Sequence, residues 1–308
     1  MTKIEREDIQ IISRHSNWSE GSIDKILKQE IYSNKESWGK FLRLFFISLG
    51  VSFTTAGIIF FFAYNWADLH KFIKIGLIES LIVIIILTVL FSKISLDIKN
   101  ILLTGASILV GVLFAVFGQI YQTGANAYDF FLGWTMFITL WVAISNFAPL
   151  WLVFITLINT TLVLYSQQVA HDWSEVFVFT LLFCINILFL TIALFGKKTT
   201  KNIKPPIWFT NLIALVSVSF STIGIFDKQQ TSFFVLIIIT LILYSVGIKY
   251  GLKVKSGFYL SIIPFSIIII ISAFLVKSSS MFFINLFVIA SVTFVIRNLI
   301  NLQKKWIN

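Results

Sequence analysis

The polar side chains with the clearest potential to form a site lie between two strongly apolar segments, in residues 114–134. These side chains are Gln119, Tyr121, Gln122, Asn126 and Asp129. Amide oxygens and a carboxylate can bind a cation, a proton or a small hydrogen-bonding solute. Gly124 permits a turn with positive φ inside the run. The run therefore predicts either a polar pocket or an interfacial loop whose tyrosines belong to an aromatic belt.

Three more candidate residues lie in the first two apolar segments. Asn65 and Trp66 follow the first of them, and Glu79 lies about two turns into the second. A carboxylate at that depth costs about 3 kcal/mol on insertion scales, so we expect Glu79 to face the protein interior or to be protonated. It then belongs either to a proton or cation site or to a hydrogen bond between helices. Lys71 and Lys74 are expected to extend to the outer surface.

Motifs typical of catalysis or cofactor binding are absent from the sequence. There is no Gly-rich phosphate loop, nucleophile elbow, His-Glu-x-x-His motif or paired-carboxylate hydrolase motif. The single cysteine, Cys184, excludes an intramolecular disulfide and a cysteine-based metal cluster. We therefore predict no catalytic, cofactor-binding or metal-binding residue, and we expect a non-enzymatic role rather than an enzymatic one. Asn159 and Asn186, inside apolar segments, are expected to join helices by hydrogen bonds.

The composition decides which elements must position these residues. The chain of 308 residues is 57% hydrophobic and only 12% charged, whereas soluble domains have about 25% charged residues. Lipid must be the solvent for most of it, so we predict an all-α, polytopic integral membrane protein. Ten apolar runs have about the 20 residues needed to cross the hydrocarbon layer. They are 44–64, 73–91, 100–118, 128–145, 147–165, 175–195, 206–226, 232–249, 257–275 and 280–297.

The hydrophilic part of the chain is confined to residues 1–43, and residues 44–308 form the predicted transmembrane domain. Ser19 is a typical helix start, and Ile23, Ile26 and Leu27 share one helical face. We therefore predict a short cytoplasmic amphipathic helical segment. It either packs as a cap on the membrane domain or docks a membrane or envelope protein.

The net charge of +10 has an uneven distribution that predicts the orientation. With a cytoplasmic N-terminus and ten spans, all but four of the 24 Lys and Arg residues lie on the cytoplasmic side. The four on the other side are Lys71, Lys74, Lys228 and Lys277. We therefore predict that both termini are cytoplasmic and that Asn65 and residues 119–127 lie at the outer face. Orientation explains the excess of bases, so the expected partner is the lipid bilayer and not nucleic acid.

Two motifs and the helical tail before them carry a family resemblance. They are Gly57–Trp66 and Gly118–Gly124, the latter leading to Tyr128 and Trp134. In these the chain resembles the bacterial predicted membrane protein family named domain of unknown function 2157, over the tail and roughly the first five segments. The resemblance implies a bacterial inner-membrane location and directs attention to residues 64–66 and 119–124. It implies no activity and no catalytic residue.

Three functions are compatible with this sequence. The first is transport of a small solute or ion through a polar site near the outer face. The second is a non-catalytic scaffold or envelope-assembly partner that uses residues 1–43 and the outer loops. The third is a lipid- or glycan-modifying enzyme with Asp129 as general base.

Overall fold

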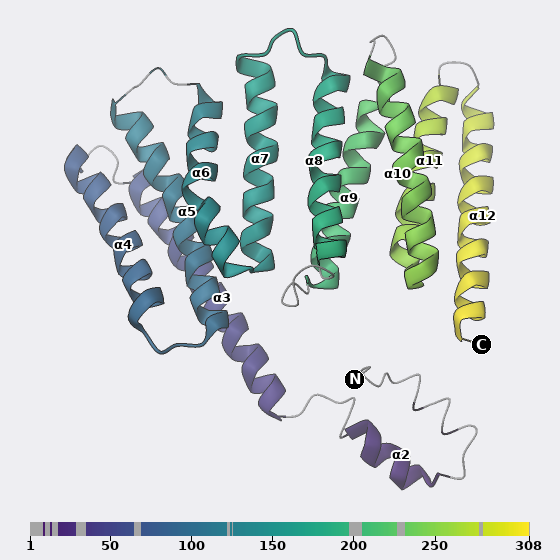
Figure 1. Ribbon diagram of the computed structural model, residues 1–308, viewed down its shortest axis with the longest axis horizontal. Helices are drawn as coiled ribbons and strands as arrows, with labels where there is room; N and C mark the ends of the chain where they lie inside the picture. Colours follow the sequence, from purple (N-terminus) through teal and green to yellow (C-terminus); the bar gives the residue numbers. More distant parts are fainter. Residues whose placement is uncertain are drawn as a thin grey trace. The chain divides into compact units, whose positions relative to one another are not determined.

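The computed structural model is built from α-helices (Figure 1). It describes Ile9, Ser13 and residues 18–28, 35–64, 69–121, 124, 126–196, 205–226, 232–276 and 280–307. These residues contain eleven α-helices and no strand, which confirms the predicted all-α class.

Ten of these helices are long and apolar enough to cross a membrane, as the sequence predicted. They are α3 (Lys35–Tyr64), α4 (Lys71–Phe91), α5 (Leu96–Tyr121), α6 (Ala127–Ser145), α7 (Ala148–Gln168), α8 (Glu175–Phe195), α9 (Ile207–Gly224), α10 (Ser232–Val254), α11 (Gly257–Leu275) and α12 (Met281–Ile307). The predicted limits differ most at the two ends, because α3 begins before residue 44 and α12 continues past residue 297. Hydropathy detects only the part of a helix that lies in lipid, whereas Lys, Glu and Gln can extend a helix into water.

The N-terminal part contains α2 (Glu20–Ile26), which starts where the sequence predicted. The Ser19 side chain accepts a hydrogen bond from the Ser22 amide at 3.3 Å and so caps the helix. The rest of the predicted tail helices falls largely outside the described residues. The division into residues 1–43 and 44–308 stays a prediction.

Two compact units make up the chain, Met1–Leu113 and Phe114–Asn308, and the division falls inside α5. In the first unit α3 and α5 approach closely at Gly105, where an added Cβ would lie 2.6 Å from Val51 Cγ1. At the start of α5, Asp97 pairs with Lys40 of α3 at 3.2 Å, with both side chains largely exposed.

The second unit has its core among α8, α9, α10 and α11, which contact one another. One buried cluster joins Phe183, Val218, Leu236 and Ile263 from these four helices. Figure 1 shows α7 and α8, and likewise α11 and α12, running as antiparallel neighbours. Large apolar side chains such as Phe234 lie on the outside, where lipid is the expected contact.

Prolines mark two helix starts in this unit and interrupt one helix interior. Pro149 lies in the first turn of α7, and Pro206 is the N-cap residue of α9, as the sequence predicted. Pro264 lies inside α11.

Candidate functional site

The residues predicted to form a polar site are divided between the two units, and only some of them are described. Asn65, Trp66 and Gln122 lie outside the described residues. Gln119 and Tyr121 are exposed at the end of α5, and Asn126 is exposed at the N-cap of α6. Asp129 is half-buried in the first turn of α6. The Asp129 amide donates to the Asn126 carbonyl at 3.1 Å, which is a backbone bond of the first helical turn. No side-chain hydrogen bond is described between any two of Gln119, Tyr121, Asn126 and Asp129, and their role as a site stays a prediction.

Packing around the first turn of α6 comes from residues that the sequence did not single out. The Tyr128 amide donates to Gln168 Oε1 at 3.0 Å, so the end of α7 caps the start of α6. The Tyr128 ring contacts Tyr165, and Tyr165 contacts Trp173, with ring centroids 5.2 and 5.5 Å apart. This chain of aromatic rings is the arrangement expected of an interfacial belt.

Glu79 occupies an exposed position on α4, beside the fully buried Ile78. Of the two expectations for Glu79, the exposed position disfavours an interior-facing carboxylate, and the protonated form stays a prediction. Lys74 was expected to extend to the outer surface, but it is 7% exposed. Ile78 and Ile82 follow at intervals of four residues, so Lys74 lies on the packed face of α4.

A better-formed polar site lies in the core of the second unit, where four hydroxyl groups and one carbonyl oxygen close a ring. We call it the hydroxyl ring. Its members are the Val218 carbonyl, Ser221 and Thr222 of α9, Tyr244 of α10 and Ser266 of α11. All four hydroxyl residues are buried.

Distances around the hydroxyl ring are short. Tyr244 Oη lies 2.7 Å from Ser221 Oγ and 2.6 Å from Ser266 Oγ. Thr222 Oγ1 lies 2.6 Å from Ser266 Oγ and donates to the Val218 carbonyl at 2.7 Å. Ser221 Oγ lies 3.0 Å from the same carbonyl and closes the ring.

Hydrogen counting shows that the hydroxyl ring has spare acceptor capacity. Each hydroxyl carries one hydrogen, and the Val218 carbonyl carries none. Five oxygen–oxygen contacts therefore share four hydrogens. One contact always lacks a hydrogen, so the ring can accept a hydrogen bond from a molecule that reaches it.

A cavity of about 100 Å³ adjoins the hydroxyl ring, and we call it the Tyr244 cavity. Val218 and Tyr244 line it, and it extends along α10 to Gly247 and Tyr250. A cavity needs only about 15 Å³ to hold a water molecule, so this one has room for several. Most of its wall is aliphatic, and its polar lining residues are Tyr244 of the ring and, away from the ring, Thr191, Tyr250 and Tyr259.

Two more buried hydroxyls lie on the opposite side of the hydroxyl ring from this cavity. Thr240 precedes Tyr244 on α10 by one turn, and Ser272 follows Ser266 on α11. Because α10 and α11 are antiparallel neighbours, both positions are displaced in the same direction, by about 6 Å and about 9 Å along the helix axes. Thr240 Oγ1 and Ser272 Oγ have no hydrogen-bond partner among the described residues, although both atoms are buried. Buried polar groups normally have partners, so an ordered water is the expected partner of each hydroxyl.

The hydroxyl ring has only a weak signature in the sequence. Ser221, Thr222, Tyr244 and Ser266 occur singly or in a pair within long aliphatic runs, where such residues are usually helix contacts. No acid and no amide accompanies them at ring level. Only the register between α9, α10 and α11 brings the four hydroxyls together, and no periodicity within one helix reveals that register.

Comparison with known families bears on the first half of the chain. The family model described as Predicted membrane protein (DUF2157) matches residues 17–151. This part of the chain, a little under half of its length, is therefore similar to the DUF2157 family. The DUF2157 region contains α2 to α6 and the first turn of α7, so it holds all the residues of the sequence-predicted site. The hydroxyl ring lies beyond it. No curated protein and no solved structure matches the chain.

Proposed function

We propose that this membrane protein conducts a small uncharged polar solute through the second unit, past the hydroxyl ring. The observation that carries the proposal is the ring itself, with the Tyr244 cavity on one side and two unpartnered buried hydroxyls on the other. Polar side chains that only join helices satisfy one another, as the amides of Asn159 and Asn186 do. Those at and beyond the ring leave capacity for a visiting molecule.

The chemistry of the ring favours a neutral solute with hydrogen-bond donors. α9, α10 and α11 contain no Asp or Glu, so a cation at the ring would have no counter-charge from these helices. Because one contact in the ring has no hydrogen, an oxygen of the ring can accept a hydrogen bond from a hydroxyl or amide N–H of the solute. Water and small polyols have this character.

Osmotic swelling of proteoliposomes tests this proposal. Purified protein is reconstituted, and light scattering follows swelling in gradients of glycerol, urea and erythritol. We expect faster swelling than in protein-free liposomes for at least one probe. Tyr244→Phe and Ser221→Ala should each slow it by about tenfold, the factor for one lost hydrogen bond of about 1.4 kcal/mol.

Ser219→Ala is the matched control, because Ser219 is an exposed serine on the same helix that bonds only to the Leu215 carbonyl. Liposomes that contain this variant should swell at the same rate as those that contain the unchanged protein. Equal swelling with and without protein for all three probes would overturn the proposal. So would unchanged rates in both ring variants.

We further propose that the protein resides in a bacterial cytoplasmic membrane with both termini inside. The distribution of Lys and Arg supports this orientation, and the family resemblance supports the location. Docking of a membrane or envelope protein through residues 1–43 is a separate proposal, supported only by the apolar face of α2. Pull-down with and without residues 1–43 from crosslinked native membranes tests it.

A further inference from the structure

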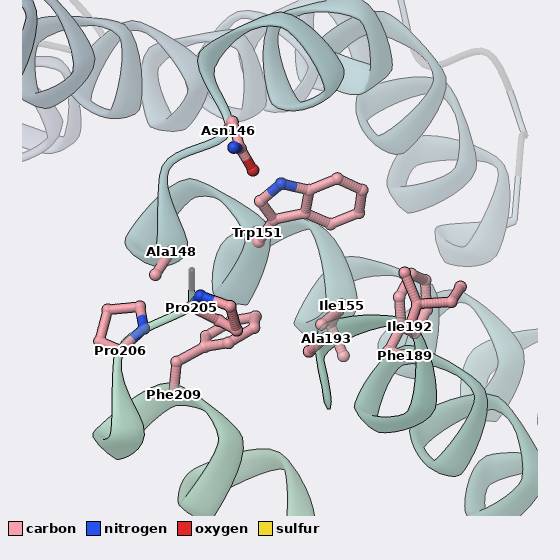
Figure 2. Close-up of a pocket in the computed structure, with 10 residues that line it drawn as sticks. All are labelled: Asn146, Ala148, Trp151, Ile155, Phe189, Ile192, Ala193, Pro205, Pro206 and Phe209. Atoms are coloured by element: carbon pink, nitrogen blue, oxygen red, sulfur yellow. The ribbon is translucent and has the colours of Figure 1, made fainter. Parts of the chain in front are cut away.

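A second pocket lies in the second unit where the ends of α7, α8 and α9 meet, and we call it the Trp151 pocket (Figure 2). Its volume is about 230 Å³. Its floor is formed by the buried side chains Ile155, Ala193 and Phe209, which belong to one apolar cluster. In Figure 2, Ala148 and the two prolines lie opposite Phe189 and Ile192. An apolar cavity of about 150 Å³ already accepts benzene, so this pocket accommodates a segment of an acyl chain.

Two helix N-termini border the same pocket. Ala148 is the first residue of α7, Pro206 is the N-cap residue of α9, and both line the pocket. The first amides of a helix have no partner inside the helix and carry a partial positive charge. Neither N-cap side chain, Phe147 or Pro206, supplies a capping hydrogen bond. The rim therefore offers two sets of hydrogen-bond donors to an anion.

The mouth of the pocket also carries polar side chains, whereas its floor is apolar. Asn146 adopts a left-handed conformation with φ of 46° at the end of α6, which places its amide at the mouth. Figure 2 shows that amide directed toward the indole ring of Trp151. A tryptophan beside a polar rim is typical of the interface between hydrocarbon and headgroups.

Charge in the sequence agrees with an anionic occupant. The connection between α8 and α9 contains four lysines and no acid. The four lysines lie outside the described residues. Basic segments next to a membrane helix attract anionic lipids by about 1 kcal/mol per residue. The charge distribution also predicts that this side is the cytoplasmic one.

We infer that the Trp151 pocket binds an anionic phospholipid of the surrounding membrane. One acyl chain occupies the floor at Ile155 and Phe209, and the headgroup lies at the N-termini of α7 and α9. This inference is independent of the proposed conduction, because the pocket and the hydroxyl ring share no residue.

Quenching of tryptophan fluorescence by brominated lipids tests the inference. The protein is reconstituted in phosphatidylcholine vesicles that contain a minor fraction of either brominated phosphatidylglycerol or brominated phosphatidylcholine. We expect stronger quenching by the brominated phosphatidylglycerol. Ala148→Leu, which fills the pocket, and Trp151→Phe, which removes the one of the nine tryptophans that lines it, should both abolish this excess.

Ala143→Leu is the matched control, because Ala143 is an exposed alanine of α6 outside the pocket. It should keep the full excess. If Ala148→Leu does not fold, Trp151→Phe decides the result alone. Equal quenching by the two lipids in the unchanged protein overturns the inference. An excess that persists in Trp151→Phe also overturns it.

Discussion

Asn159 of α7 and Asn186 of α8 hydrogen-bond to each other through both amide groups. Asn159 Nδ2 donates to Asn186 Oδ1 at 3.2 Å, and Asn186 Nδ2 donates to Asn159 Oδ1 at 2.9 Å. Asn186 is fully buried and also donates to the Leu182 carbonyl at 2.8 Å. The prediction that these asparagines join helices is thus confirmed, and the pair fixes the register of α7 against α8.

Replacing one member of this pair should destabilise the protein. Asn159→Leu leaves Asn186 with an unmatched amide in the core, and we expect a loss of about 1 kcal/mol. Asn159→Leu combined with Asn186→Leu should cost less than the sum of the single changes. A double-mutant cycle on unfolding in detergent measures the coupling, expected at about 0.6–1.7 kcal/mol. Additive effects would show that the pair contributes nothing.

Gly224 at the end of α9 allows a close contact that a methyl group should break. An added Cβ would lie 2.7 Å from Phe179 Cβ and 2.8 Å from Leu236 Cδ2. Because a Cβ cannot move without its backbone, Gly224→Ala should destabilise by about 1–3 kcal/mol. Gly57→Ala in α3 meets nothing within 4 Å and should be neutral or stabilising by about 0.5–1 kcal/mol. Thermal unfolding of both variants in one detergent tests the difference.

Gln168 should contribute a helix cap from a distant part of the chain. Gln168→Ala removes the acceptor of the Tyr128 amide, and we expect a loss of about 1 kcal/mol. Gln167→Ala is the control, because Gln167 is exposed and no described hydrogen bond involves it. The difference is read from the melting temperatures. A similar loss in both variants would refute a specific role for Gln168.

Replacing Thr240 with valine is expected to raise stability and to lower conduction. Thr240→Val keeps the shape but removes a buried hydroxyl that has no described partner. We expect stability to rise by about 1 kcal/mol while solute flux falls. Thermal unfolding and the swelling assay measure the two effects. A loss of stability would mean that an ordered water already satisfies the hydroxyl.

The predicted orientation leads to a labelling experiment in whole cells. In a Cys184→Ala background, His171→Cys lies in the exposed connection between α7 and α8 and should react with a membrane-impermeant maleimide. Ser22→Cys in α2 and Gln303→Cys in α12 should react only after permeabilisation. Labelling of Ser22→Cys in intact cells would show that the orientation is the opposite of the predicted one.

The sequence predicted the membrane helices well because lipid imposes a simple rule. Every span needs about 20 apolar residues, and charge shows which loops stay inside. Interhelical bonds of Asn159 and Asn186 were predictable for the same reason, since a buried amide in lipid must find a partner. The family resemblance is also confirmed, and its match ends at residue 151.

Positions that depend on register between helices were not predictable. Nothing in the sequence distinguishes Gly105, which contacts Val51, from Gly118, which contacts nothing within 4 Å. Hydroxyls that form the ring come from three helices, and each alone is an ordinary intramembrane residue. Conspicuous polar residues such as Glu79 drew attention because they are costly in lipid, yet the described contacts give Glu79 no partner.

Pro264 weakens α11 at the level of the hydroxyl ring. It has no amide hydrogen, so the Leu260 carbonyl one turn earlier lacks its helical donor. Ser266 follows Pro264 by two residues and contacts both Thr222 and Tyr244. A bend of α11 at this weak point would swing Ser266 away from α9 and α10. A bend at the proline would therefore break the contacts of Ser266 with Thr222 and Tyr244 and open the ring.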